Sequence, residues 1–337
     1  MGRRAVCGLA LACLALPGCA APPEQIVLTA AGRGAPDADV DGDPWRLLPG
    51  GAVAWVWLDA KALAAASFGT EANQVLVEHL PLSSKGDFNL GSDVDQVVLG
   101  MYATAGADAV AVARGRFDRE GIAAAIAADP TARNGRPIQV NSFAGRKVYV
   151  TDGWAMVPVT KQTLVFGSEV GVRRVLERIE EGRLLRSLPS WYEQMLAQKT
   201  AALVLGVDLD AQPVPSVLRT KLAFLEGMRA GRLLGNFSDP GMHLAGTLTY
   251  DSPESAVRAS AALEAQAAAL RRAEMLLAML KMPRPIRSLE TRATGKDTQV
   301  TVAVDGRAIA MLLTQTDEVL GRIEQEGVLA PTEPAPR

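Results

Sequence analysis

Short runs of alternating apolar and polar residues fill the first half of the chain. Such alternation is typical of strands, because successive side chains point to opposite faces of a sheet. The predicted strands cover 53–59, 97–102, 109–113 and 163–166, with three more around Ile138, Val148 and Val157. A helix is predicted over 119–128, directly after Phe117-Asp118.

The best-defined helix of the sequence follows Ser168, whose hydroxyl can cap its first turn. Gly182 ends it, because glycine readily adopts the left-handed conformation that closes a helix. Apolar residues recur between these two positions on one helical face: Val172, Val175, Leu176 and Ile179.

The second half repeats much of this order. Leu209-Asp210-Ala211 resembles Leu58-Asp59-Ala60, and Tyr250-Asp251 resembles Phe117-Asp118. The predicted strands cover 201–209, 233–237, 242–250, 286–294 and 298–304. Helices are predicted over 216–229 and 253–282, the latter with Ser252 as N-cap and Pro253 in its first turn. A last helix follows, with Ile309, Leu312, Leu313, Thr316, Leu320 and Ile323 on one side.

These patterns predict an α+β fold: two similar units of antiparallel sheet packed with helices, arranged in tandem. The units span 45–186 and 187–326, and their sheets either lie side by side or merge into one. Residues 19–44 are rich in Gly, Pro and Asp and predict a flexible tether, and 327–337 predict a disordered tail.

The first residues have the order of an export signal. Arg3 and Arg4 precede the apolar stretch 5–16, which ends in Leu16-Pro17-Gly18-Cys19. Twelve residues rise about 18 Å as a helix, too little for a bilayer core of about 30 Å. The run that ends in Cys19 resembles the lipobox of bacterial lipoproteins. The pattern of the whole chain resembles that of uncharacterised lipoproteins with an α+β fold.

That resemblance implies that residues 1–18 are a signal peptide and that Cys19 becomes the first, acylated residue. Three acyl chains, palmitate among them, would anchor the protein to a membrane. Ala20 follows the cysteine instead of Asp, which by the best-known sorting rule implies delivery to the outer membrane of the periplasm-containing envelope, with the face left open; the inner membrane is the alternative. All three cysteines (Cys7, Cys13 and Cys19) lie in this leader.

The charge balance bears on possible partners. The net charge is −2, and loss of Arg3 and Arg4 with the leader makes it about −4. Nucleic-acid binding depends on clustered positive charge, so no nucleic-acid partner is expected.

The run Asp37-Ala38-Asp39-Val40-Asp41-Gly42-Asp43 matches the start of an EF-hand calcium loop. The twelfth position of such a loop needs a bidentate acid, but Leu48 stands there and Pro44 interrupts the path. The run is therefore predicted to be a solvated acidic part of the tether, and no metal or other cofactor is expected.

Other residue types that carry chemistry are scattered. His79 and His243 have no partners at zinc-site spacing. Asp118 and Asp251 precede helices and are interpreted as caps, and Asp59 and Asp210 stand at strand ends. No nucleophile elbow, phosphate loop or dinucleotide fingerprint is present. We therefore predict no catalytic residues and no enzyme.

Two apolar features suggest binding surfaces. Trp55 and Trp57 share one face of a predicted strand, as core residues or as an aromatic platform. Met275, Met279 and Met282 recur at helical spacing, in a buried helix or at an adaptable groove.

The resulting hypothesis is an envelope lipoprotein with a non-catalytic role in binding an envelope protein or in assembly. A carrier of lipid or another apolar ligand, and a hydrolase without a recognisable motif, are the alternatives.

Overall fold

The computed structural model describes residues 34–314, except 85, 87, 105–107, 199, 211, 273–278 and 280–283. The strands of the first half are β1 (Ala54–Asp59), β2 (Val94–Met101), β3 (Ala109–Gly115), β4 (Gln139–Phe143), β5 (Arg146–Thr151), β6 (Trp154–Pro158) and β7 (Thr163–Ser168). Those of the second half are β8 (Leu203–Asp208), β9 (Met228–Asn236), β10 (Gly241–Tyr250), β11 (Ile286–Thr294) and β12 (Asp297–Asp305).

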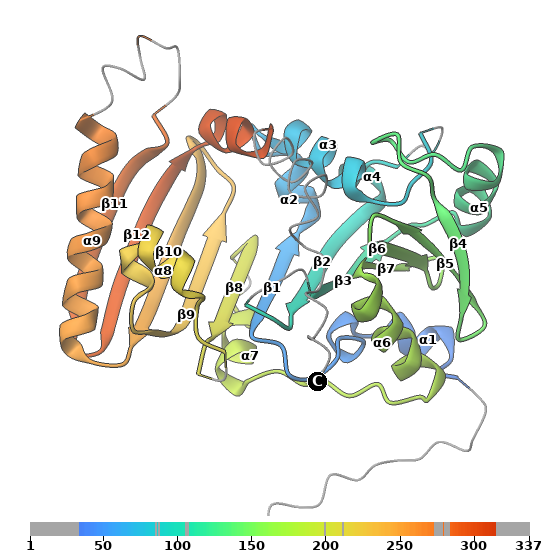
Figure 1. Cartoon of the computed structure of the whole chain (residues 1–337), viewed down its shortest axis with the longest axis horizontal. Coiled ribbons are helices and arrows are strands. Elements are labelled where there is room, and N and C mark those ends of the chain that lie inside the picture. The colour runs from blue at the N-terminus through green and yellow to red at the C-terminus, as the bar shows by residue number, and fades with distance from the viewer. Residues whose placement is uncertain are drawn as a thin grey trace, which may run out of the picture.

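Helices lie between and beside these strands (Figure 1). Near the start are α1 (Asp37–Val40), the 3₁₀ turn η1 (Pro44–Arg46), α2 (Ala60–Ala64), α3 (Gly69–His79) and α4 (Leu90–Asp93). Further along are α5 (Arg119–Ala128), α6 (Glu169–Glu180), α7 (Ser190–Leu196), α8 (Ser216–Lys221), the 3₁₀ turn η2 (Ala223–Leu225) and α9 (Pro253–Arg272). Residues 306–314 are also helical.

The described strands form one sheet of twelve, in the order β11-β12-β10-β9-β8-β1-β2-β3-β7-β6-β5-β4. Each strand is antiparallel to its neighbours, as Val56 opposite Leu205 illustrates for β1 and β8. The predicted α+β class is therefore confirmed, and the two halves merge into a single sheet. Their first strands, β1 and β8, pair at its centre. Each half continues outward through its next two strands and then through its remaining strands in reverse order, four in the first half and two in the second.

This central pairing decides which helices share a face. An antiparallel pair is related by a rotation about an axis perpendicular to the sheet, so equivalent helices of the two halves fall on the same side. The "α5 face" carries α2 to α5 over the first half and α9 over the second. The opposite "α6 face" carries η1, α6 and α7, over the first half and β8.

The first half is buried on both faces. In β3, Val110 and Val112 pack beneath α6, while Ala111 and Ala113 face α5. In the second half, α9 packs on β11 and β12 through small residues such as Ala256 and Ala259. Small side chains allow α9 to approach the sheet closely, so few large apolar side chains lie between the helix and the strands.

Caps set the helix starts as predicted. Ser168 Oγ accepts a hydrogen bond from Gly171 N at 3.1 Å and starts α6. Ser252 Oγ accepts from Ser255 N at 3.1 Å and starts α9. Gly182, with φ of 66°, follows the end of α6.

The helix predicted over 216–229 is wrong in its second part. α8 ends at Lys221, η2 follows, and β9 begins at Met228. Leu209 N donates to Arg229 O at 2.7 Å, so the backbone after Gly227 is used by the sheet. Gly227 has φ of 73°, a conformation that only glycine adopts readily.

The tether predicted up to residue 44 is also wrong over 34–44. Val40 is fully buried, and Ala35 N donates to Ile179 O of α6 at 2.7 Å. Thr160 and Thr163 donate their hydroxyls to Asp41 at 2.5 and 2.6 Å. Composition gave no hint of this packing, because the partners lie more than a hundred residues away. Residues 19–33 lie outside the described residues.

Candidate functional site

A cleft of about 800 Å³ opens on the α6 face between η1 and α7. We call it the Trp57 cleft. It is lined by Gly42, Asp43, Pro44, Trp45, Trp57, Gln96, Arg186, Glu193, Leu196, Ala197, Gln198, Ala201 and Val204. Its volume lies within the range of about 300–1,000 Å³ that is usual for ligand sites.

The floor of the cleft is built on two neighbouring strands. Trp57 on β1 and Gln96 on β2 point to the same face because of the antiparallel register. The indole Nε1 of Trp57 donates to Gln96 Oε1 at 3.0 Å, which fixes both side chains. Trp57 is half-buried and contributes to the wall of the cleft. A flat aromatic ring and an oriented amide thus lie side by side.

The rim of the cleft is charged. The guanidinium of Arg186 contacts Asp43 Oδ2 at 2.9 Å and Glu193 Oε1 at 3.4 Å. Asp43 also caps η1, accepting from Trp45 N at 3.1 Å. All three charged side chains are 27 to 45 % exposed, so the energy of these pairs is largely screened by water. Their contribution is to hold the walls of the cleft together.

An aromatic cluster behind the cleft positions both walls. Tyr192 of α7 is fully buried and lies edge-on to Trp45 with ring centroids 5.4 Å apart. Its hydroxyl donates to Val204 O of β8 at 3.0 Å. Trp55 and Trp191 complete the cluster. Gly206 makes room for it, because a Cβ there would meet the Tyr192 ring at 2.4 Å.

Trp55 and Trp57, the two tryptophans singled out from the sequence, lie in different environments, although both point to the α6 face of β1. Trp55 is 6 % exposed and belongs to the core, whereas Trp57 lines the cleft. Sequence reasoning missed Gln96 and the Arg186 rim. No local pattern marks them, since Arg186 and Asp43 are 143 positions apart.

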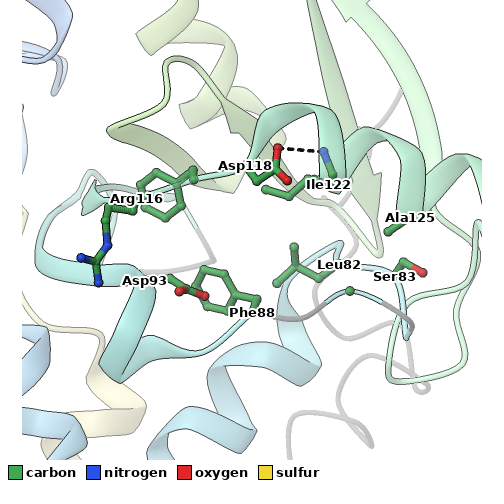
Figure 2. A pocket seen from close by; sticks show the side chains of 11 residues that line it. Leu82, Ser83, Phe88, Asp93, Arg116, Asp118, Ile122 and Ala125 are labelled. Carbon is green, nitrogen blue, oxygen red and sulfur yellow. Dashed lines mark hydrogen bonds between the residues drawn. The ribbon is translucent and has the colours of Figure 1, made fainter.

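A second cavity, of about 220 Å³, lies on the α5 face between α4 and the start of α5. Figure 2 shows Leu82, Phe88 and Ile122 pointing into it, with Arg116 and Asp93 at its side. Its polar neighbours already have structural partners: Asp118 Oδ1 accepts from Gly121 N at 3.0 Å, and Arg116 donates to Ser92 O at 2.6 Å. The surface of the cavity is mostly apolar.

The adaptable groove predicted at the methionine-bearing helix is neither the Trp57 cleft nor the second cavity of the described residues 34–314. Within the part of the chain that the structure describes, no residue of α9 lines the Trp57 cleft or the second cavity. Met279 is 77 % exposed, and Met275 and Met282 lie outside the described residues.

The histidines are not brought together. His79 ends α3 on the α5 face, while alternation along β10 places His243 on the α6 face. His243 Nε2 lies 2.8 Å from Asp239 O. Of the predicted caps, Asp118 caps α5, but at α9 the cap is Ser252 and not Asp251. Asp59 caps α2 through Ala62 N at 2.9 Å, and Asp210 lies 3.5 Å from Arg229.

The described residues were found to hold neither a cluster of metal ligands nor a membrane-spanning helix. Among the described residues, no group of three or more His, Cys, Asp or Glu could hold a metal ion. In the described chain, no helix is long and apolar enough to cross a membrane. Cys19 and the rest of the leader lie outside that part of the chain.

Comparison with known proteins identifies the fold alone. No family model matches the chain, and no curated protein sequence matches it. Crystal form I of TP0453 has a similar structure, with a TM-score of 0.50 over 82 % of this chain and 97 % of that chain, at 10 % identity. Crystal form III of the same protein has a TM-score of 0.49 over 81 % of this chain and 98 % of that chain, also at 10 % identity. At this level of identity the first likeness indicates a shared architecture.

Proposed function

We propose that this protein is an envelope lipoprotein, acylated at Cys19, that binds a hydroxyl-rich envelope component, such as a saccharide, without catalysis. The observation that carries the proposal is the floor of the Trp57 cleft, where Trp57 and Gln96 are locked together beneath a charged rim. The anchoring part rests on the sequence around Cys19.

The chemistry of the cleft suits a sugar ring. An aromatic face packs against the C–H groups of such a ring, and burial of aromatic surface is favourable. Planar amide, guanidinium and carboxylate groups can exchange pairs of hydrogen bonds with neighbouring hydroxyls. Gln96, Arg186 and Glu193 supply one group of each kind around the cleft.

The same lining favours binding over catalysis. It contains no hydroxyl, thiol, amine or imidazole side chain that could act as a nucleophile or base. Its two carboxylates, on Asp43 and Glu193, both contact the guanidinium of Arg186. This arrangement supports a static binding surface.

A direct test is calorimetric titration of the whole chain with soluble peptidoglycan fragments and with the oligosaccharide of lipopolysaccharide. Trp57→Ala should weaken binding about tenfold, because an aromatic contact contributes about 0.5–1.5 kcal/mol beyond its buried area. Trp154→Ala is the matched control, since Trp154 is half-buried on β6 and does not line the cleft. If neither saccharide binds, or both variants lose equally, the cleft does not have this role.

The anchoring part is tested separately by fractionation of cells. Wild-type protein should be found with the membrane, and Cys19→Ala should be found in the soluble fraction. Membrane association that is unchanged in Cys19→Ala would refute acylation at this residue while leaving the cleft proposal intact.

The apolar pocket of Figure 2 favours a second candidate, a carrier of an apolar ligand. Its volume of about 220 Å³ is below the usual range for ligand sites and would hold only part of an acyl chain. Native mass spectrometry would show co-purified lipid for the wild type. Ala125→Trp would fill the pocket and abolish that signal, and Ala124→Trp, on the exposed side of α5, would retain it. Lipid retained by the filled variant would argue against this candidate.

A further inference from the structure

A third cleft, of about 490 Å³, lies near the outer end of the first half. It is formed by the start of α5, the turn between β4 and β5, and the end of β6. We call it the basic cleft; its lining residues are Arg119, Glu120, Ala123, Ala144, Gly145, Arg146, Lys147, Tyr149, Val157 and Pro158. Three cations therefore line it against one carboxylate.

The strand pattern explains the placement of Lys147 and Tyr149, whereas Arg146 has the opposite parity on β5 and lines the cleft at its edge. Lys147 and Tyr149 are two residues apart on β5 and point to the same face of the sheet. Tyr149 packs in the core beneath α5, so this is the α5 face, and Arg119 in the first turn of α5 lies above it. Arg146 starts β5, and its guanidinium donates to Val159 O at 2.9 Å. That bond holds Arg146 at the edge of the cleft.

The positive charge of the cleft exceeds the negative charge beside it in the described chain, which is Glu120 in the lining and Asp37 near Arg146. Neither Arg119 nor Lys147 has an ion pair or side-chain hydrogen bond with another described residue. Burial lowers the pKa of Arg146, Asp37 raises it, and Arg119 lowers it further. The effect of Arg119 is that of a like charge close by, which an anion would relieve. Because the whole chain has a net charge of −2, this excess is local.

The basic cleft also lies near the point where the chain enters the fold. Ala35 is held to α6, and two residues later Asp37 is close enough to Arg146 to influence its charge. Residues 19–33, which connect Cys19 to this point, can span at most about 50 Å. If Cys19 is acylated as proposed above, the headgroups of the membrane are within reach of the cleft.

We propose that the basic cleft binds a phosphate group, carried by an anionic phospholipid headgroup or present as a free phosphate ester. Arg119 and Lys147 supply the charge, and Arg146 supplies a guanidinium fixed by Val159 O. Guanidinium and phosphate match in geometry and form paired hydrogen bonds. The site is independent of the Trp57 cleft, which lies on the opposite face of the sheet.

The test uses the whole chain with Cys19→Ala, so that acyl chains do not contribute to vesicle binding. Co-sedimentation with vesicles of equal parts phosphatidylglycerol and phosphatidylcholine reports on the headgroup, and calorimetry with glycerol 3-phosphate reports on the free ester. The double variant Arg119→Ala/Lys147→Ala should bind phosphatidylglycerol vesicles about 25-fold more weakly, or about fivefold for each cation removed.

The matched control is Arg292→Ala/Lys296→Ala, one arginine and one lysine that are likewise exposed, near the opposite edge of the sheet. The control should retain binding, because the total charge is the same and only the position differs. Binding of vesicles alone identifies a lipid headgroup, and binding of both probes identifies a general phosphate site. Equal losses in the two double variants, or binding to neither probe, would overturn the proposal.

Discussion

The two halves of this molecule share a strand order but are covered differently. The first half is packed on both faces, by α2 to α5 on one side and by η1, α6 and α7 on the other. The second half carries α9 on one face, and the opposite face of β10 and β12 presents exposed polar residues such as His243, Gln299 and Thr301. All three cavities described above involve the doubly covered half, because clefts form where elements of different layers meet.

The sequence shows the reason for this difference. β3 is apolar at consecutive positions, as a strand buried on both faces must be. β10 alternates instead, with Leu244 and Leu248 facing α9's side of the sheet and His243 and Thr247 facing water. A strand that alternates in this way needs helices on only one face of the sheet, because its other face is polar.

The largest expected difference between the halves is in core packing. Tyr192 and Tyr250 are both at most 1 % exposed, and each donates its hydroxyl to a backbone carbonyl. Tyr192→Ala should lower the free energy of unfolding by about 5 kcal/mol and Tyr250→Ala by about 3 kcal/mol, the two ends of the usual range for aromatic truncation. Tyr192 packs against three aromatic rings in the larger core, whereas Tyr250 lies in the smaller core beside α9, which can relax.

Urea unfolding of both variants measures these losses. Tyr192→Phe and Tyr250→Phe serve as controls, each removing one hydrogen bond at a cost of about 1 kcal/mol. Equal losses for the two alanine variants would show that double coverage does not determine the stability of the core.

The second-largest difference is expected at two charged pairs, one in each half, that differ in burial. Asp305 in the second half has only 5 % of its side chain exposed and accepts a hydrogen bond from Arg287 Nε at 2.7 Å. Lys61 and Asp95 in the first half are more than half exposed. Asp305→Asn should cost about 2 kcal/mol, and Asp95→Asn less than about 0.5 kcal/mol.

The same contact predicts a pH dependence. Burial raises the pKa of Asp305, but hydrogen bonds from Arg287, Arg307 and Ala308 outweigh burial and hold it below the ordinary 3.8. A depressed pKa stabilises the fold above the unfolded value, and this stability is lost as the pH falls through the folded value. Urea unfolding at neutral pH and below pH 3.8 should therefore show a smaller acid loss in Asp305→Asn than in the wild type. An unchanged acid loss would contradict this assignment.

The smallest expected contrast is at the helix caps. Ser168 and Ser252 make the same 3.1 Å bond at the starts of α6 and α9. Ser168→Ala and Ser252→Ala should each cost about 1 kcal/mol for the lost cap bond. Each variant also loses one side-chain bond, from Ser168 Oγ to Asp108 Oδ1 at 3.3 Å or from Ser252 Oγ to Ser255 Oγ at 3.1 Å. Thermal unfolding measures both losses. A clear difference between the two variants would show that the starts of α6 and α9 contribute differently to the stability of the two halves.

Local patterns predicted the local features. The bounds of α5, the cap and end of α6, and most strands follow from alternation and from residues within one turn of each boundary. Contacts between distant residues were not predictable in this way. Asp41 is held by Thr160 and Thr163, and Asp43 by Arg186, so an acidic run that resembled a tether is fixed against the fold, with Val40 in the core. The Trp57 cleft depends on such contacts, and only Trp57 itself was a candidate from the sequence.

The pairing of β1 with β8 has a consequence for how the chain reaches this state. Val56 lies opposite Leu205, 149 positions later, so the central seam of the sheet can close only after all seven strands of the first half and α7 have been made. Until then, β1 presents unpaired backbone amides and carbonyls along an apolar strand, which is a template for pairing with another chain. Newly made protein is therefore most vulnerable to aggregation at the position that later becomes the middle of the sheet.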